Sequence, residues 1–117
     1  MFAERKSVTI ETDASGDGVG YIDVAYGRLH GILYVKDDYA DGVDFDVDLE
    51  ATGQVLWSED DVNASAARYP RVAVHDTDGV ALDPAVYEPV LIAHDRIRIT
   101  VANGGNTTSG QFIAVMG

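Results

Sequence analysis

The sequence contains no cysteine, which excludes disulfide bonds, thiolate zinc sites, iron–sulfur clusters and cysteine nucleophiles. Basic residues are also scarce, because 8 Lys and Arg stand against 20 Asp and Glu and give a formal net charge of -12. An electrostatic field of this sign repels phosphate backbones and anionic lipids, so we expect neither nucleic acid nor a membrane as a partner. The stability of this acidic protein must come from packing.

Long hydrophobic runs are missing as well. No segment approaches the ~20 apolar residues of a membrane span, and residues 1–6 (MFAERK) lead into the chain without the apolar stretch of a signal peptide. We therefore expect synthesis in the cytoplasm without processing. With 117 residues, of which 46% are hydrophobic, the chain is expected to fold as one domain over residues 1–117.

What the sequence does contain is a repeated alternation of apolar and polar residues. In the clearest run, 43–50 (VDFDVDLE), apolar residues alternate with Asp and Glu, which is typical of a half-buried antiparallel strand. Similar runs recur roughly every ten residues between Gly, Asp, Asn and Pro, and predict an all-β antiparallel β-sandwich of about eight short strands. We favour a jelly-roll-like topology, with an immunoglobulin-like sandwich as the alternative.

The first half of the chain gives several local expectations. Residues 13–18 (DASGDG) are rich in residues that favour tight turns and predict a hairpin between the run at 8–10 and the run at 19–26. The latter continues through a glycine into 29–35, where Gly31 predicts a bulge or a close backbone approach.

The second half is less regular before its last two runs. Residues 59–67 lack alternation and predict a loop, with one helical turn over 64–67 as an option. Pro84 and Pro89 confine their segment to loop or edge-strand geometry. The final runs, separated by the turn residues 103–106 (NGGN), predict two strands at the end of the sequence.

Two acidic loops and the acidic strand are the candidates for calcium binding. Residues 13–18 place oxygen side chains at alternate positions as an EF-hand loop does, but position twelve is Val24 instead of glutamate. The loop 37–42 (DDYADG) is a better candidate for calcium binding than residues 13–18, although a solvated turn is still the favoured interpretation. The carboxylates of 43–50 are best explained as a solvated strand face that opposes aggregation.

Catalytic motifs are absent from the sequence. The three histidines, His30, His75 and His94, are too far apart for one element to bring two of them together, so an enzyme with a histidine metal site is only a third hypothesis. No nucleophile elbow and no phosphate-binding glycine loop is present. We predict no catalytic residue, no cofactor and no metal site, and hence a protein that is not an enzyme.

Aromatic and arginine side chains contribute most of the binding energy at protein interfaces. The interface candidates in this sequence are Tyr39, Trp57, Tyr69, Arg71, Arg96 and Arg98. Core packing is an equal or better interpretation for Trp57. Arg96 and Arg98 share one face of an expected strand, where they are placed to pair with carboxylates of a neighbouring strand or subunit.

A set of sequence stretches carries a family resemblance over nearly the whole chain. These stretches are 34–45 (YVKDDYADGVDF), 50–54, 56–57, 62–66, 70–71, 75–77, 95–97 and 104–106. Together they resemble a family of small proteins encoded among the virion structural genes of tailed phages and prophages. The resemblance implies a virion structural protein, associated with the head or the tail, and brings no catalytic motif with it.

The leading functional hypothesis is therefore a capsid decoration or cement protein that binds the outer surface of the assembled head. Its expected partners are the major capsid protein or other virion proteins, and its expected location is the capsid surface after synthesis in the host cytoplasm. We expect a homo-oligomer, with a trimer favoured, because contacts to several shell subunits add avidity. The alternative is a tail or baseplate component, including a receptor-binding one stabilised by calcium.

Overall fold

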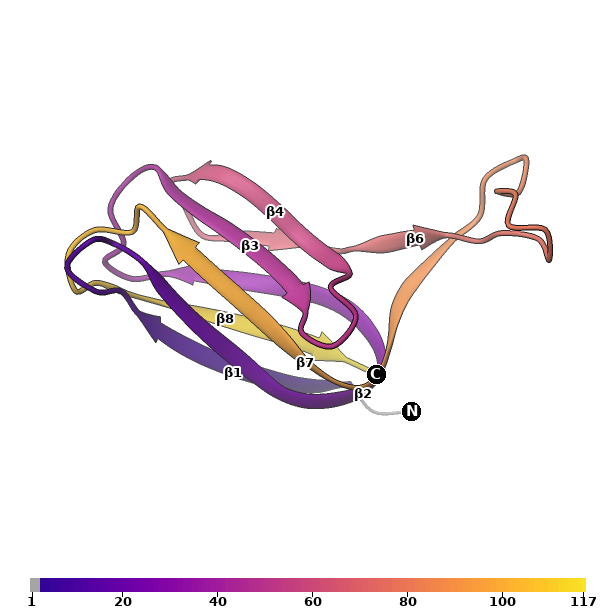
Figure 1. Ribbon diagram of the computed structural model, residues 1–117, viewed down its shortest axis with the longest axis horizontal. Helices are drawn as coiled ribbons and strands as arrows, with labels where there is room; N and C mark the ends of the chain where they lie inside the picture. Colours follow the sequence, from indigo (N-terminus) through magenta and orange to yellow (C-terminus); the bar gives the residue numbers. More distant parts are fainter. Residues whose placement is uncertain (1–2) are drawn as a thin grey trace.

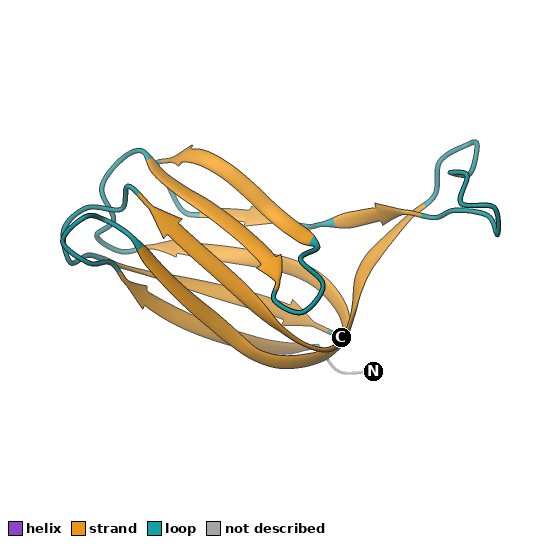
Figure 2. Ribbon diagram, in the orientation of Figure 1, coloured by secondary structure: helices purple, strands orange, loops and turns teal. Residues whose placement is uncertain are grey.

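The computed structural model describes residues 3–117, except for the side chains at positions 24 and 25; the first two residues of the N-terminal segment discussed above lie outside that range. Within it, eight β-strands follow one another along the chain (Figures 1 and 2). They are β1 (Glu4–Glu11), β2 (Gly18–Lys36), β3 (Val43–Leu49), β4 (Val55–Val62), β5 (Ala66–Arg68), β6 (Arg71–Ala73), β7 (Tyr87–Ala102) and β8 (Ser109–Met116). Within residues 3–117, no helix is long and apolar enough to cross a membrane.

The strands form an antiparallel sandwich, because the hydrogen-bonded sheet folds over on itself through the long strand β2. The second half of β2 pairs with β8 and β5, and β8 pairs with β1; we call this layer sheet A. The first half of β2 pairs with β7, which pairs with β3, and β3 with β4; we call this layer sheet B. The orders β1-β8-β2-β5 and β2-β7-β3-β4 are those of a jelly roll. The predicted jelly-roll-like sandwich is confirmed.

Two strands are much longer than the short strands that the sequence predicts. β2 has 19 residues and β7 has 16, so the runs at 19–26 and 29–35 belong to one strand. β2 bends where its pairing with β7 shifts register between Ile22 and Tyr26, opposite His94, whose φ is 56°. A second shift lies between Leu29 and Gly31. Bulges of this kind bend a strand without ending it.

Gly31 fulfils both parts of its prediction. It lies at the second register shift of β2, and a Cβ at this position would lie 2.9 Å from Cδ1 of Tyr69. Only a residue without a side chain leaves room for this ring against the backbone.

Two local predictions were wrong. Residues 13–18 do not join a hairpin, because β1 pairs with β8 while β2 begins against β7, so this turn crosses from one sheet to the other. Residues 59–67 form a loop only at 63–65, because β4 continues to Val62 and β5 begins at Ala66, and the optional helical turn over 64–67 is not formed. Asp61, with a φ of 58°, lies where the pairing of β3 and β4 shifts register, and such a shift interrupts the alternation.

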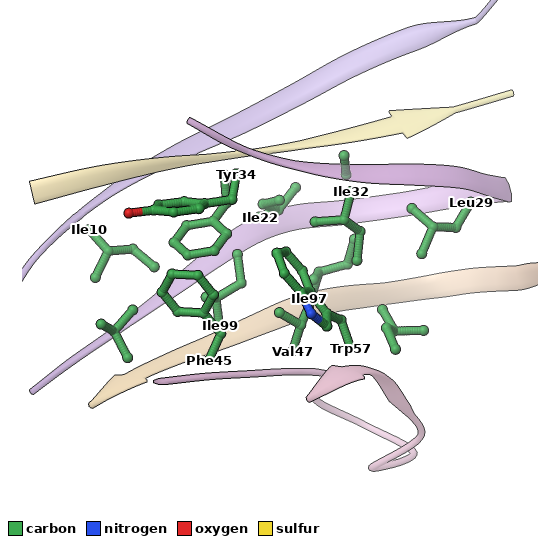
Figure 3. Packing of buried hydrophobic residues seen from close by; sticks show 14 of the residues in the cluster. Ile10, Ile22, Leu29, Ile32, Tyr34, Phe45, Val47, Trp57, Ile97 and Ile99 are labelled. Carbon is green, nitrogen blue, oxygen red and sulfur yellow. The ribbon is translucent and has the colours of Figure 1, made fainter. Parts of the chain in front are cut away.

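The core lies between the two sheets (Figure 3) and is built around the rings of Tyr34, Tyr39, Phe45, Trp57 and Phe112. Phe45 is central to this group: its ring centroid lies 4.6 Å from Tyr34, 4.9 Å from Phe112 and 5.6 Å from Trp57, all in edge-to-face geometry. Tyr39 is the fifth ring and stacks on Tyr34 at 6.0 Å. Aromatic pairs of this geometry contribute about 0.5–1.5 kcal/mol beyond the burial of their surface.

The two ends of the sandwich differ. At one end, the loops 12–17, 37–42 and 103–108 are joined by backbone hydrogen bonds, including Thr12 N to Thr108 O and Ala40 N to Gly104 O, both at 2.8 Å. At the other end, β6 and the start of β7 leave the sandwich as a projecting arm (Figure 1). The radius of gyration of 15.2 Å reflects this arm, since a compact domain of this length has a value of about 13 Å.

Candidate interaction surfaces

The outer face of sheet B carries the acidic strand, whose carboxylates are bound to neighbouring groups. Asp48 accepts two hydrogen bonds from Arg98, at 2.9 and 2.8 Å, and Glu50 pairs with Arg96. The hydrogen bonds and charge of Asp48 raise the pKa of Arg98 further above its usual value. The guanidinium of Arg96 also lies 4.0 Å from the ring centre of Tyr21. The two arginine candidates are therefore engaged within the sheet, with carboxylates of a neighbouring strand.

An open depression of about 550 Å³ lies on this face of sheet B. Its lining residues are Val19, Tyr21, Asp46, Val47, Asp48, Val55, Arg98 and Thr100. The charges of Asp48 and Arg98 satisfy each other, and the carboxylate of Asp46 accepts a hydrogen bond of 2.6 Å from Ser58 Oγ. The depression therefore offers little unpaired charge to a ligand.

The acidic loops use their carboxylates to hold the backbone. Asp13 Oδ1 accepts hydrogen bonds from the N–H groups of Ser15 and Asp17, at 2.8 and 3.1 Å. Asp38 Oδ1 accepts one from the N–H of Ser109 at 2.6 Å. Carboxylates in such turns replace missing backbone partners. Within residues 3–117, no three His, Asp or Glu side chains are grouped so that they could hold a metal ion.

Two of the aromatic interface candidates lie in the core. Tyr39 is 2% exposed, and its hydroxyl donates a hydrogen bond of 2.6 Å to the carbonyl of Ile10. Trp57 is 6% exposed, and its Nε1 donates to Glu59 at 3.0 Å. In the folded chain neither ring is available to a partner. Burial corrects the expected surface position of Tyr39, whereas for Trp57 it agrees with the core-packing interpretation.

Glu59 connects the edges of the two sheets. It lies on β4 and accepts hydrogen bonds of 2.8 Å from Nε and Nη2 of Arg68 on β5, while the Arg68 guanidinium lies 5.4 Å from the ring centre of Trp57. Burial opposes ionisation of Glu59, but the hydrogen bonds from Trp57 and Arg68 outweigh this effect and lower its pKa. This cluster closes one side of the sandwich, and such bidentate pairing is stronger than an isolated surface ion pair.

The arm comprises residues 71–89 and exposes apolar side chains. β6 pairs with the first residues of β7, from Arg71 with Pro89 to Ala73 with Tyr87, and a small turn lies beyond this ladder. Val72 packs against the core at the base of the arm. The large hydrophobic side chains exposed on the arm are Val80, Leu82, Val86 and Tyr87. A two-stranded ribbon is marginally stable in water by itself, so a partner surface would stabilise the arm.

Tyr69 and Arg71 mark the base of the arm. The Tyr69 ring packs over Gly31 but is 64% exposed. Arg71 is exposed, and its Nη1 donates to the carbonyl oxygens of His30 at 3.1 Å and Pro70 at 2.8 Å. Of the six interface candidates, these two are exposed and have no ion pair with a described residue, whereas Arg96 and Arg98 are partly exposed but paired with carboxylates.

The outer face of sheet A has little charge. On β8 the side chains of Phe112, Ala114 and Met116 point into the core, so those of Ile113 and Val115 point outward. Directly opposite residues of neighbouring strands face the same side. Leu33 lies opposite Ile113, and Val35 is exposed two residues further along β2. We call these outward residues, together with Leu91 on the neighbouring strand β7, the apolar face; its members are Leu33, Val35, Tyr69, Leu91, Ile113 and Val115.

Comparison with known proteins adds no assignment. No family model and no curated protein matches the sequence. The candidate surfaces therefore stand on the geometry of the chain alone.

The arm is the feature that sequence reasoning missed. The alternation of Val72 and Val74 is typical of a strand, and residues 76–79 together with Pro84 and Pro89 are typical of a loop, so local sequence does not distinguish an arm from a further part of the sandwich. One signal was present: Val80, Leu82 and Val86 are apolar residues in a segment rich in turn formers, where polar side chains are the rule.

Proposed function

We propose that the chain is a capsid decoration protein, a structural component that binds the outer surface of an assembled tailed-phage head. The resemblance of its sequence to small phage virion proteins supports the class of particle. The observation that carries a binding role is the arm, which extends apolar side chains beyond the sandwich. Soluble proteins rarely expose contiguous apolar surface, and where they do, it marks a site of protein contact.

The rest of the molecule suits a rigid support for such contacts. The aromatic core, the Glu59–Arg68 connection and the bonded loops at the far end hold both sheets in place. The major capsid protein or another virion protein is the proposed partner, and no chemical step is proposed for the chain. The acidic outer face of sheet B faces solvent in this arrangement, because its carboxylates are already paired with arginines or accept hydrogen bonds from neighbouring groups.

Rebinding to isolated particles tests the proposal. Purified protein is mixed with heads that lack it, with complete tails as a parallel sample, and bound protein is measured by sedimentation and located by cryo-electron microscopy. We expect saturable binding to heads at regular positions of the shell. Binding to tails alone, or to neither particle, would reject the decoration role.

A matched variant keeps the fold and removes the arm tip. Ala73 and Tyr87 are paired, so replacement of residues 74–86 by Asn-Gly closes the same ladder with a two-residue turn. We expect this variant to retain the circular dichroism spectrum of the parent chain and to lose head binding. Head binding at the parent level would show that the arm is not the carrier of the proposed function.

A further inference from the structure

Among the described residues, three cationic side chains have no ion pair, and all three lie near the base of the arm. Of the 8 Lys and Arg, the ion-paired ones are Lys6, Lys36, Arg68, Arg96 and Arg98. Within residues 3–117, no carboxylate lies within 4.0 Å of the side chains of Arg5, Arg28 or Arg71. In a protein with an excess of carboxylates, this gathering of unpaired cations is a distinct surface feature.

The strand register places these cations beside the apolar face. Arg5 on β1 lies opposite Val115, and Val115 lies opposite Gly31, on which the ring of Tyr69 packs. Arg28 on β2 lies opposite Leu91, whose side chain is 69% exposed. Arg5 and Arg28 therefore border an uncharged apolar surface at the end of the sandwich from which the arm leaves.

The tip of the arm has the complementary character. Its exposed apolar side chains include Val80, Leu82 and Val86, and among them lie the exposed carboxylates of Asp78 and Asp83. Within residues 3–117, neither of these two carboxylates has a cation within 4.0 Å. The tip is thus apolar and acidic, whereas the apolar face is bordered by arginines.

We propose that the arm of one copy packs against the apolar face of a second copy, with Asp78 and Asp83 beside Arg5 and Arg28. Each copy then provides one arm and binds one. The oligomer closes either as a two-fold dimer, in which two copies exchange arms, or as a ring, in which each arm binds the next copy around a rotation axis. This inference concerns self-association and goes beyond the proposed function, because it does not depend on the particle to which the chain binds. An arm tip that packs on a second copy is not free to contact a head, so in the oligomer the arm would support head binding through the avidity of linked copies.

A second acidic region is an alternative partner for Arg5 and Arg28 of another copy. The loop end carries Asp17 and Asp37, both exposed and without an ion pair among the described residues. It does not match the apolar face equally well. Among the described residues, the large exposed hydrophobic side chains lie on the strands of the sandwich, at the arm base or on the arm rather than in these loops. Apolar and charge complementarity together select the arm.

Charge reversal at exposed positions tests the proposal. The molar mass of the protein and its variants is measured by size-exclusion chromatography with light scattering over a range of concentrations. We expect the parent chain to give a multiple of 12.5 kDa. The pairs D78K/D83K and R5E/R28E are each expected to raise the dissociation constant about tenfold or more, because like charges across an interface are strongly unfavourable. The four substitutions together are expected to restore association.

The controls are matched in charge and in exposure. D17K/D37K gives the same net charge as D78K/D83K and is expected to leave the mass unchanged, so a general effect of lower acidity is excluded. For the apolar contact, L91D is expected to dissociate the oligomer, whereas V55D, at a residue 64% exposed on β4, is not. Circular dichroism and the melting temperature verify that each variant is folded.

Three results would overturn the inference: a monomeric parent chain at all concentrations, an oligomer that survives replacement of residues 74–86 by Asn-Gly, or a monomeric four-fold variant. These outcomes are distinct from those of the head-binding experiment. A monomer that binds heads rejects the self-association and leaves the proposed function in place. An oligomer that does not bind heads rejects the proposed function and leaves the self-association in place.

Discussion

Two tyrosines in the core differ in a way that a matched pair of substitutions can measure. The hydroxyl of Tyr39 donates a hydrogen bond of 2.6 Å to the carbonyl of Ile10. The hydroxyl of Tyr34 is buried and has no hydrogen-bond partner among the described residues. The rings are 1% and 2% exposed and stack on each other. Y34F and Y39F therefore remove the same atom from similar surroundings, and only one of them removes a hydrogen bond.

The two substitutions should have opposite effects on stability. A buried hydrogen bond contributes about 0.5–1.5 kcal/mol, so Y39F is expected to lower the free energy of unfolding by about 1 kcal/mol. A buried hydroxyl without a partner has lost its hydration without compensation, so Y34F is expected to raise the free energy of unfolding by up to about 1 kcal/mol. The variants are thus expected to differ by about 2 kcal/mol.

Urea unfolding followed by circular dichroism measures this difference. The dependence on urea should be the same in all three proteins, because the surface exposed on unfolding hardly changes, so the midpoints report the free energies directly. In thermal unfolding the variants should be separated by roughly 8 °C for a chain of this size. Equal destabilisation by Y34F and Y39F would falsify the reasoning, since it would show that the Tyr34 hydroxyl also has a partner, such as a bound water.

The remaining predictions use the same urea assay. Burial and the nearby charge of Asp37 raise the pKa of Tyr34 to about 12, so its contribution to stability is complete below about pH 10 and is lost between about pH 10 and 12; Y34F should reduce this decline. A Cβ at Gly110 would lie 2.3 Å from Cε2 of Tyr39, so G110A should cost about 1–3 kcal/mol. Asp95 Oδ1 accepts from two backbone N–H groups, so D95A should cost about 2 kcal/mol and D95N, which keeps an acceptor, clearly less.

The strands could be predicted where their alternation is uninterrupted. Residues 43–50 form β3 and its continuation because their acidic residues point outward while Val43, Phe45, Val47 and Leu49 fill the core. Arg96 and Arg98 point outward on β7 by the same alternation, and their ion pairs with Glu50 and Asp48 follow once β7 pairs with β3. Local sequence predicts the direction of these side chains, since this depends only on their position along the strand.

The failures have a common physical cause in non-local pairing. Residues 13–18 have the composition of a hairpin turn, but β8, almost a hundred residues away, is the partner of β1. Tyr39 lies in a loop of typical surface composition, yet its ring is buried because Gly110 leaves space beside it. Composition limits the local conformation of a turn, whereas the partner of a strand or ring depends on the whole fold.

In the proposed self-association, the arrangement of charge would favour a single orientation of two strongly acidic copies. Most of its cations are used within the sheets, so random encounters between copies bring like charges together. The cations that remain unpaired border the apolar face, so only an approach of an acidic, apolar segment to that face is attractive. At physiological salt, screening over about 8 Å weakens the steering of distant charges but leaves the apolar contact unchanged. The charges thus select the orientation, and burial of the apolar side chains supplies the free energy of association.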